Sequence, residues 1–346
     1  MTRAFTIQSI IDDVRRDGDR AAADWSSYFD GTTSTTPLRA QAGGDVPVTS
    51  ILRAADAVRR WHEAQRPADL TMEVNPGVWL ERKWVPLRSV GIYVPKGLVS
   101  TLIMAAVPAL AAGVERVVVC TPPSGAAAVA AAAELLGIHD VWALGGVQAI
   151  AAMAYGTESI APVDKIVGPG SGPLNEAKLL VQRDVAIDLP AGPSDVVVAV
   201  DEGEDDDVVR QELAAQQEHG PDSEGHVVRV GDDLEAALAA IEDYAAEHVF
   251  LLGPKAESLA PRIRNAGAVF VGRYSPVPAG DYATGGNHIL PTGGWSARVG
   301  GVGLETFMKS VTIQRVSPEG LADLAPVIEE LAMLEGLTNH ARTARR

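Results

Sequence analysis

Short apolar runs separated by longer amphipathic stretches dominate the middle of the chain. Apolar runs at residues 115–120, 141–144 and 164–167 predict buried strands, and the patterns over 124–137 and from Val147 onward predict helices. Strands that alternate with helices in this rhythm form βαβ units, in which neighbouring strands run parallel. The first half of the chain is therefore predicted to hold a parallel sheet covered by helices.

The same rhythm begins again after Gly192-Pro193. The predicted strands there are 195–200, 226–230, 248–252 and 268–271, and the predicted helices are 206–217, 233–245 and 256–266. Residues from about 317 to 342 predict mostly helix with no strand beside it. The predicted fold class is α/β, with two Rossmann-like parallel-sheet lobes and a helical C-terminal tail.

Composition and charge narrow the class of protein. Of the 346 residues, 47% are hydrophobic and 21% are charged, which is enough to bury a large core in two or more lobes. The net charge of −16 repels phosphates and anionic lipids, so neither nucleic acid nor a membrane is expected as a partner. The sequence begins without an apolar segment long enough for a signal peptide, and no apolar run is long enough to cross a bilayer.

The chain contains a single cysteine, Cys120, at the end of a predicted buried strand. One cysteine excludes an internal disulfide and a cysteine-based zinc site within one chain. Its position predicts a small core residue rather than a nucleophile. We therefore expect a protein of the reducing cytoplasm.

Three of the seven histidines lie in polar, glycine-containing segments. His219 follows Gln216 by three residues at the end of a predicted helix, so the two side chains point the same way. Asp281 and His288 share a glycine-rich loop, and His340 ends a third such segment. Imidazoles combined with oxygen donors suit Zn2+, and the set predicts a metal site. Any one of these histidines alone would more simply cap a helix.

A carboxylate and an imidazole stand side by side at Glu247 and His248, where a predicted strand begins. Both side chains could line a cleft and divide the roles of base and acid. The alternative is a surface glutamate beside a half-buried histidine, and spacing alone gives this alternative roughly twice the weight. The histidines at 62, 139 and 226 lie in ordinary helix, turn or strand contexts and are interpreted as structural.

Glycine-rich turns follow several predicted strands. Residues 168–173 come after a strand and open a helix, the position at which backbone N–H groups bind phosphate. Pro173 stands where the third glycine of the dinucleotide fingerprint would be, so the residues alone do not establish NAD binding. Residues 93–97 and 145–148 form similar turns. A nucleotide crevice and a set of tight turns in a doubly wound sheet explain these segments equally well.

Taken together, the motifs resemble the histidinol dehydrogenase family from about residue 12 to residue 340. The segments that carry the resemblance are VGIYVPKG (90–97), ALGGVQAIAAMAYGTESIAPVDKIVGPG (143–170), IDLPAGPSDV (187–196), QQEHGPDS (216–223), AEHVFLL (246–252), PAGDYATGGNHILPT (278–292) and EGLTNH (335–340). Their number and order make the resemblance specific.

The resemblance implies a set of roles for individual residues. It implies that zinc is bound by Gln216, His219, Asp281 and His340, and that NAD is contacted by Tyr93, Gln148 and Ser171. Glu247 is implied as the catalytic base and His248 as its acid-base partner. The implied substrate-binding residues are Ser194, Gln216, His219, His248, Asp281, His288, Glu335 and His340.

The resemblance also implies an activity and an assembly. The expected reaction oxidises L-histidinol to the aldehyde and then, after attack of an activated water, to L-histidine with a second NAD. The expected domains are a discontinuous metal-binding and catalytic lobe (1–92 plus 196–302), an NAD-binding lobe (93–195) and a helical dimerisation tail (303–346). In a homodimer that exchanges these tails, Glu335 and His340 would complete the partner's site.

Several positions depart from the family pattern. Ser171 replaces a usual asparagine, Lys96 a usual glycine, Ala246 a usual proline and Val277 a usual glutamate, and the segment between QQEHGPDS and AEHVFLL is shortened. With valine in place of glutamate at position 277 and a lysine at position 96, the site would favour a substrate with an anionic group over histidinol, which carries a cationic amine. The alternatives are therefore a relative that oxidises another small polar alcohol, such as a sulfonated diol, and a metal-binding paralogue without turnover.

Overall fold

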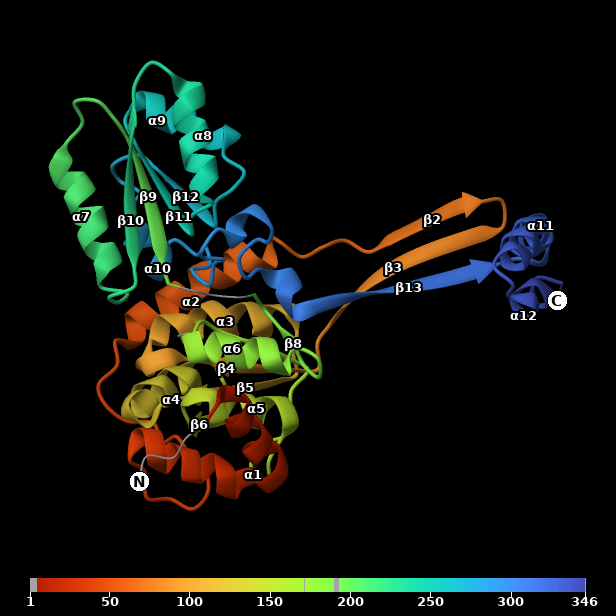
Figure 1. The fold of residues 1–346 in the computed structure, drawn as a ribbon, viewed down its shortest axis with the longest axis horizontal. Coiled ribbons are helices and arrows are strands. Elements are labelled where there is room, and N and C mark those ends of the chain that lie inside the picture. Colours follow the sequence, from red (N-terminus) through yellow and green to blue (C-terminus); the bar gives the residue numbers. More distant parts are fainter. Residues whose placement is uncertain (1–4, 171, 190–192, 346) are drawn as a thin grey trace. The chain divides into compact units, whose positions relative to one another are not determined.

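The computed structural model describes residues 5–170, 172–189 and 193–345. The chain divides into two compact units, residues 1–65 with 87–307 and residues 66–86 with 308–346. The architecture is mixed α/β with parallel sheets, as predicted (Figure 1). In the larger unit the two sheets have six and four strands. Within the described ranges, no helix is both long and apolar enough to cross a membrane.

The six-stranded sheet has the order β1-β6-β5-β4-β7-β8, and only β1 runs antiparallel. The chain leaves β4 toward β5 and β6 on one side and returns to β7 and β8 on the other. Such a reversal of strand order opens a crevice at the carboxyl ends of the strands, where ligands bind in doubly wound folds. The strands are β1 (Leu38–Arg39), β4 (Ser89–Tyr93), β5 (Arg116–Thr121), β6 (Val141–Ala143), β7 (Lys165–Val167) and β8 (Ala186–Ile187).

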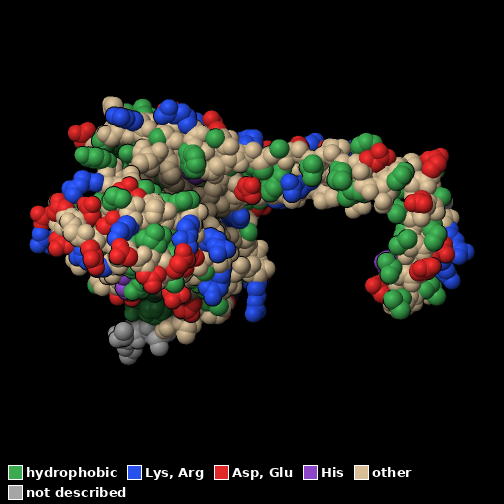
Figure 2. Space-filling view, turned by 90° about the horizontal axis from the view of Figure 1, so that it is seen from above, with side chains coloured by type: hydrophobic (Ala, Val, Ile, Leu, Met, Phe, Trp, Pro, Cys, Tyr) green, Lys and Arg blue, Asp and Glu red, His purple; other side chains and the backbone are tan. Residues whose placement is uncertain are grey.

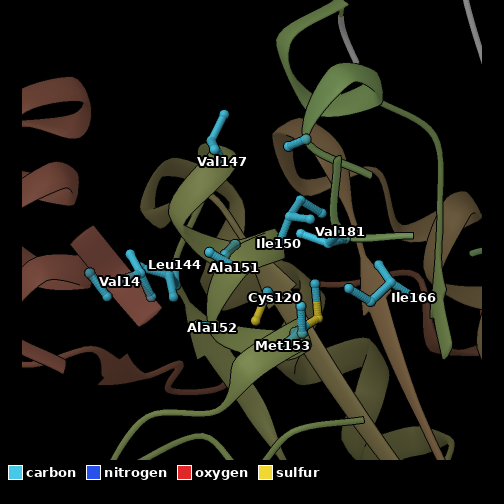
Figure 3. Close-up of a cluster of buried hydrophobic side chains, with 14 of the residues drawn as sticks. Val14, Cys120, Leu144, Val147, Ile150, Ala151, Ala152, Met153, Ile166 and Val181 are labelled. Carbon is cyan, nitrogen blue, oxygen red and sulfur yellow. The ribbon is translucent and has the colours of Figure 1, made fainter. Parts of the chain in front are cut away.

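Helices cover the six-stranded sheet, and the hydrophobic core lies between the helices and the strands. Figure 3 shows Ile150 and Met153 of α5 packed near Cys120 of β5 and Ile166 of β7, all buried. Cys120 is fully buried, which confirms its prediction as a core residue, and burial raises the pKa of its thiol. The helices are α1 (Ile7–Asp30), α2 (Val48–Glu63), α3 (Val99–Ala112), α4 (Ala126–Leu135), α5 (Gly146–Tyr155) and α6 (Gly172–Val181).

The four-stranded sheet is entirely parallel and has the order β10-β9-β11-β12. Its central strands β9 and β11 are valine- and leucine-rich, as expected for strands buried on both faces. The elements are β9 (Asp195–Asp201), β10 (Glu224–Val230), β11 (His248–Leu252), β12 (Ala268–Val271), α7 (Asp206–Gln217), α8 (Leu234–Tyr244), α9 (Pro254–Ser258) and α10 (Val277–Tyr282).

One predicted helix of this sheet is wrong. Residues 256–266 do not form a continuous helix; α9 ends at Ser258, and a single 3-10 turn (Ala260–Arg262) follows. Pro261 lies inside that turn, where its missing N–H and its ring are tolerated only near the start of a helix. The other strands and helices predicted after residue 195 are present, with ends shifted by at most two residues.

The smaller unit is an antiparallel sheet followed by two helices. Its sheet has the order β13-β3-β2, formed by β2 (Leu70–Asn75), β3 (Val78–Pro86) and β13 (Met308–Val316), and α11 (Pro318–Leu334) and α12 (Thr338–Thr343) follow. The sequence analysis placed a helical tail from residue 303 and missed β13, whose branched residues Val311, Thr312 and Ile313 favour a strand.

The surfaces of the two units differ in character. In Figure 2 acidic and basic side chains lie intermixed over the visible face of the larger unit. The smaller unit exposes large apolar side chains on its sheet and on its terminal helices. These include Leu70, Met72, Trp79, Val311, Leu331, Met333 and Leu334. An apolar surface of this extent is typical of an interface with another protein chain.

Candidate active site

The amino ends of β9 and β11 bring three predicted site residues to one edge of the four-stranded sheet. Ser194 directly precedes β9, Glu247 directly precedes β11, and His248 is the first residue of β11. The two strands are neighbours in register, with His248 opposite Val196. The Glu247 backbone N–H donates to Asp195 Oδ1 at 2.6 Å, which fixes the start of β11 against β9.

The end of α7 adds the amide and imidazole that the sequence placed there. Gln216 is buried, and its Nε2 donates to Ser194 Oγ at 2.8 Å. His219 lies just beyond the helix and contributes to the lowered pKa values of His248 and His288, so the three imidazoles share one environment. Burial lowers the pKa of His219 itself, which keeps the ring neutral and able to bind a cation.

The third contribution comes from α10 and the loop that follows it. The sequence analysis placed Asp281 in a loop; it lies in the short helix α10, which starts after Pro276 and has Pro278 in its first turn. His288 lies in the loop, and its Nδ1 is 3.1 Å from the Asp281 backbone carbonyl. The Asp281 carboxylate is 4.0 Å from His248 Nε2.

Burial sets the protonation states at this site. It raises the pKa of Glu247 to about 8, and it lowers the pKa of His248 to about 3 and that of His288 to about 4. His248 Nδ1 lies 3.8 Å from Glu247 Oε2, and at neutral pH these shifts leave both groups uncharged. A carboxyl group with a pKa near neutrality can both take and return a proton, which suits it to general base catalysis.

A cavity of about 450 Å³ opens beside these residues. His248, Asp281 and His288 contribute its polar groups, and Phe270 and Leu290 contribute apolar wall. Concave sites of this size with a few convergent polar groups hold small molecules. Among the described residues, Glu247 Oε2 and both ring nitrogens of His248 are buried without a hydrogen-bond partner. Buried polar atoms in that state indicate a ligand with polar groups.

The donors of the larger unit fit a zinc ion in chemistry. Gln216, His219 and Asp281 offer an amide, an imidazole and a carboxylate from adjacent elements, and zinc accepts each of these ligand types. In the described part of the chain, no group of three or more His, Cys, Asp or Glu side chains could hold a metal by itself. The set therefore leaves room for another protein ligand.

The residues expected to contact NAD lie at the carboxyl edge of the six-stranded sheet. Tyr93 ends β4, and its hydroxyl accepts a hydrogen bond from the Gly146 N–H at 3.2 Å. Gln148 is fully buried on α5, and in the described structure neither atom of its amide has a partner. An unpaired buried amide at a strand-to-helix turn fits a polar ligand such as a dinucleotide. Ser171 lies outside the described residues.

Two predicted site residues belong to the other compact unit. Glu335 and His340 are exposed on its terminal helical segment, so neither is buried in a site of its own unit. Lys96 is exposed with φ of 48°, a left-handed conformation that a glycine adopts at lower cost.

Val277 does not face the cavity. Its side chain is buried in an apolar cluster with Val198 and Phe250, and its N–H donates to Glu212 Oε2 at 3.1 Å. The expectation that this valine changes the substrate is therefore corrected, since a core side chain cannot contact the bound alcohol.

Two acidic residues with a role in building the site were missed by the sequence analysis. Asp195 anchors the Glu247 backbone, and Glu212 accepts from the first N–H of the helix that carries Asp281. The sequence spacing of both residues could have identified them. Asp195 directly follows Ser194, and Glu212 precedes Gln216 by four residues on α7, which places both side chains on one face of the helix.

The chain is similar in sequence and in fold to histidinol dehydrogenases. The sequence profile of that family, described as histidinol dehydrogenase, matches residues 2–232 and 224–346. The histidinol dehydrogenase of Methanosarcina barkeri is 38% identical, with 99% of this chain and 91% of the relative covered, and that of Escherichia coli K12 is 39% identical, with 97% and 89% covered. The crystal structure of histidinol dehydrogenase from Elizabethkingia anophelis superposes with a TM-score of 0.91 at 31% identity, covering 100% of this chain and 93% of that one. The chain belongs to the histidinol dehydrogenase family.

Proposed function

We propose that this protein oxidises L-histidinol to L-histidine with NAD. The observation that carries the proposal is the buried group formed by Glu247, His248 and Asp281, of which His248 and Asp281 line one cavity. Neither alternative function gains support. Val277 is buried in the core, and Glu247 and His248, which a paralogue without turnover would not need, lie within 4 Å of each other.

In the proposed reaction, the residues of this chain hold the alcohol and move its protons. His288 lines the cavity, and it would orient the substrate together with the hydrogen-bonded pair Ser194 and Gln216. Glu247, with a pKa near neutrality, takes a proton from the water that adds to the aldehyde carbon, and neutral His248 beside it exchanges protons with Glu247.

The two cofactors supply chemistry that side chains lack. Gln216, His219 and Asp281, with His340, would hold zinc, which polarises and orients the alcohol oxygen. Tyr93, Gln148 and the position of Ser171 would hold NAD, which accepts hydride. The proposed functional division is a catalytic lobe built on the four-stranded sheet, an NAD lobe built on the six-stranded sheet and a dimerisation tail (303–346), with both lobes Rossmann-like. Residues 1–92, expected in the catalytic lobe, instead include α1, β1 and β4 of the six-stranded sheet.

The assay that tests the function uses purified protein loaded with zinc. It should reduce NAD when L-histidinol is added, forming two NADH and one L-histidine per alcohol, because the same site performs both oxidations. His219→Ala should lose bound metal and turnover together. Zinc-loaded wild-type protein that leaves L-histidinol unchanged over a range of pH would contradict the proposal.

We further propose a homodimer in which each tail completes the partner's site. This would supply the missing ligand, since His340 is exposed on its own unit. Inactive His340→Ala and Glu247→Gln proteins, mixed under conditions that exchange subunits, should recover about a quarter of the wild-type activity, because half of the dimers are hybrids and each hybrid has one intact site. Mixtures that stay inactive after demonstrated exchange would place the whole site within one chain.

A further inference from the structure

The loop that carries His288 is fastened to two helices that also cover the six-stranded sheet. Gly285 in this loop has φ of 98°, and a Cβ added there would lie 2.6 Å from the Ala57 carbonyl of α2. Only glycine allows both the backbone conformation and this approach. The loop backbone therefore packs directly against α2, two residues before Asn287.

Asn287 uses its whole amide to hold the loop in place. Its Nδ2 donates to the Met104 carbonyl of α3 at 2.7 Å and lies 3.3 Å from His62 Nε2 of α2. Its Oδ1 accepts from the Ile289 N–H at 2.9 Å. Both N–H groups and the carbonyl of the side chain are thus occupied, and only one orientation of the amide satisfies them.

His62 is the acceptor that this arrangement requires. Its side chain is fully buried, and its Nδ1 lies 2.7 Å from the Val58 carbonyl. A carbonyl only accepts, so Nδ1 carries the proton and Nε2 is free to accept from Asn287. Burial lowers the pKa of His62 more than its backbone hydrogen bonds to Val58 and Val302 raise it, so the ring stays neutral.

The clamp formed by His62 and Asn287 links the two proposed halves of the site. Met104 lies on α3, which begins just after the turn at residues 95–97 that follows Tyr93. Asn287 is the neighbour of His288, whose Nδ1 contacts the Asp281 carbonyl. A displacement of about 1 Å at a substrate-positioning group can cost on the order of 10²-fold in rate.

We propose that His62 and Asn287 are positioning residues, which fix His288 against the helices α2 and α3 of the six-stranded sheet. The kinetic consequence of this inference rests on the proposed function. His62 does not line the cavity, and Asn287 lines it with its amide turned to His62, Met104 and Ile289. Both act through His288, so their replacement lowers kcat for L-histidinol while the KM for NAD and the zinc content stay close to wild type.

Three variants separate this role from a general loss of stability. His62→Leu removes the acceptor and should lower kcat by at least about tenfold, the scale found for groups that orient functional side chains. His62→Gln offers Oε1 in place of Nε2 and should restore most of the rate. Gln65→Leu is the matched control, because Gln65 Oε1 accepts from the Leu304 N–H at 3.1 Å near the same end of α2 and does not touch Asn287.

A double-mutant cycle tests whether the effect passes through His288. In a His288→Ala background, His62→Leu should change kcat little further, since the group it positions is gone. If His62→Leu lowers kcat by the same factor in both backgrounds, or if Gln65→Leu lowers it equally, the clamp is only structural and the inference is overturned.

A second readout does not depend on turnover. Two-bond correlations between ring protons and ¹⁵N in histidine-labelled, metal-free protein should show His62 as the neutral Nδ1–H tautomer. The ring signals of His288 should shift in His62→Leu and return toward wild type in His62→Gln. A His62 ring protonated at Nε2, or a His288 signal that does not change in His62→Leu, would overturn the clamp whether or not the protein oxidises histidinol. If the spectra are as predicted but the protein does not oxidise histidinol, only the proposed function is removed.

Discussion

The two parallel sheets of the larger unit differ in the edge at which polar groups are left open. At the carboxyl edge of the six-stranded sheet, Gln148 is buried without a partner in the described structure and Gly146 forms the turn before it. The same edge of the four-stranded sheet is closed. There Asp201, at the end of β9, accepts from the backbone N–H groups of Lys255 and Ala256 at 2.8 Å each.

This difference explains why one sheet would bind a nucleotide and the other would not. The first N–H groups of a helix after a strand are where a phosphate binds in such folds, and in the four-stranded sheet the Asp201 carboxylate occupies them. The chemistry proposed for this sheet lies at its amino edge instead, where Ser194, Glu247 and His248 meet. In this proposal two sheets of one architecture serve different purposes, and the fold class alone does not locate the site.

The largest loss of activity is expected from replacing Glu247, whose Oε2 has no hydrogen-bond partner among the described residues at the amino edge of the four-stranded sheet. Glu247→Gln keeps the size of the side chain but cannot take a proton, so turnover with L-histidinol should fall by at least ~10²-fold. Metal content and NAD affinity should not change, because neither depends on that proton. Turnover within a fewfold of wild type would show that the amino edge does not supply the base.

The pH dependence of the reaction should follow the burial of the same carboxyl group. Burial raises the pKa of Glu247 to about 8, so below that pH the group keeps its proton and cannot act as a base. The value of kcat/KM should then rise about tenfold per pH unit and level off above pH 8. A profile that is flat between pH 6 and 9, or that falls as pH rises through 8, would contradict the assignment.

The sequence predicted most of the two parallel sheets because short apolar runs alternate with helical patterns along the chain. It failed where local signals compete. The run 256–266 has a helical pattern that Pro261 interrupts, and β13 was missed because its strand partner β3 lies more than 200 residues earlier in the chain. The branched residues of β13 are a local signal for a strand, but they do not reveal its distant partner.

The candidate site shows the same division between local and long-range information. Gln216 with His219, and Glu247 with His248, are close in sequence, so their spacing revealed them. Their packing against Asp281 depends on contacts with Asp195 and Glu212, which the sequence did not single out. His62 was interpreted as structural because nothing near it in sequence indicates its contact with Asn287, 225 residues away.

The most direct test of the difference between the two edges is the affinity for NAD of two matched glycine variants. Gly146 (φ of 67°) and Gly253 (φ of 101°) both lie at strand-to-helix turns, and an added Cβ would lie 2.6 Å from the Gln148 side chain in the first case and 2.6 Å from that of Asp201 in the second. Both substitutions to alanine should therefore destabilise the protein by a similar, modest amount, ~1–2 kcal/mol.

Their effects on NAD should differ. Gly146→Ala displaces the Gln148 amide and should raise the Kd for NAD, measured by calorimetry on zinc-loaded protein, by about tenfold, equal to about 1.4 kcal/mol. Gly253→Ala should leave that Kd within about twofold of wild type, which corresponds to less than ~0.5 kcal/mol. Equal Kd values for the two variants, or a larger increase for Gly253→Ala, would contradict the assignment of the cofactor to the carboxyl edge of the six-stranded sheet.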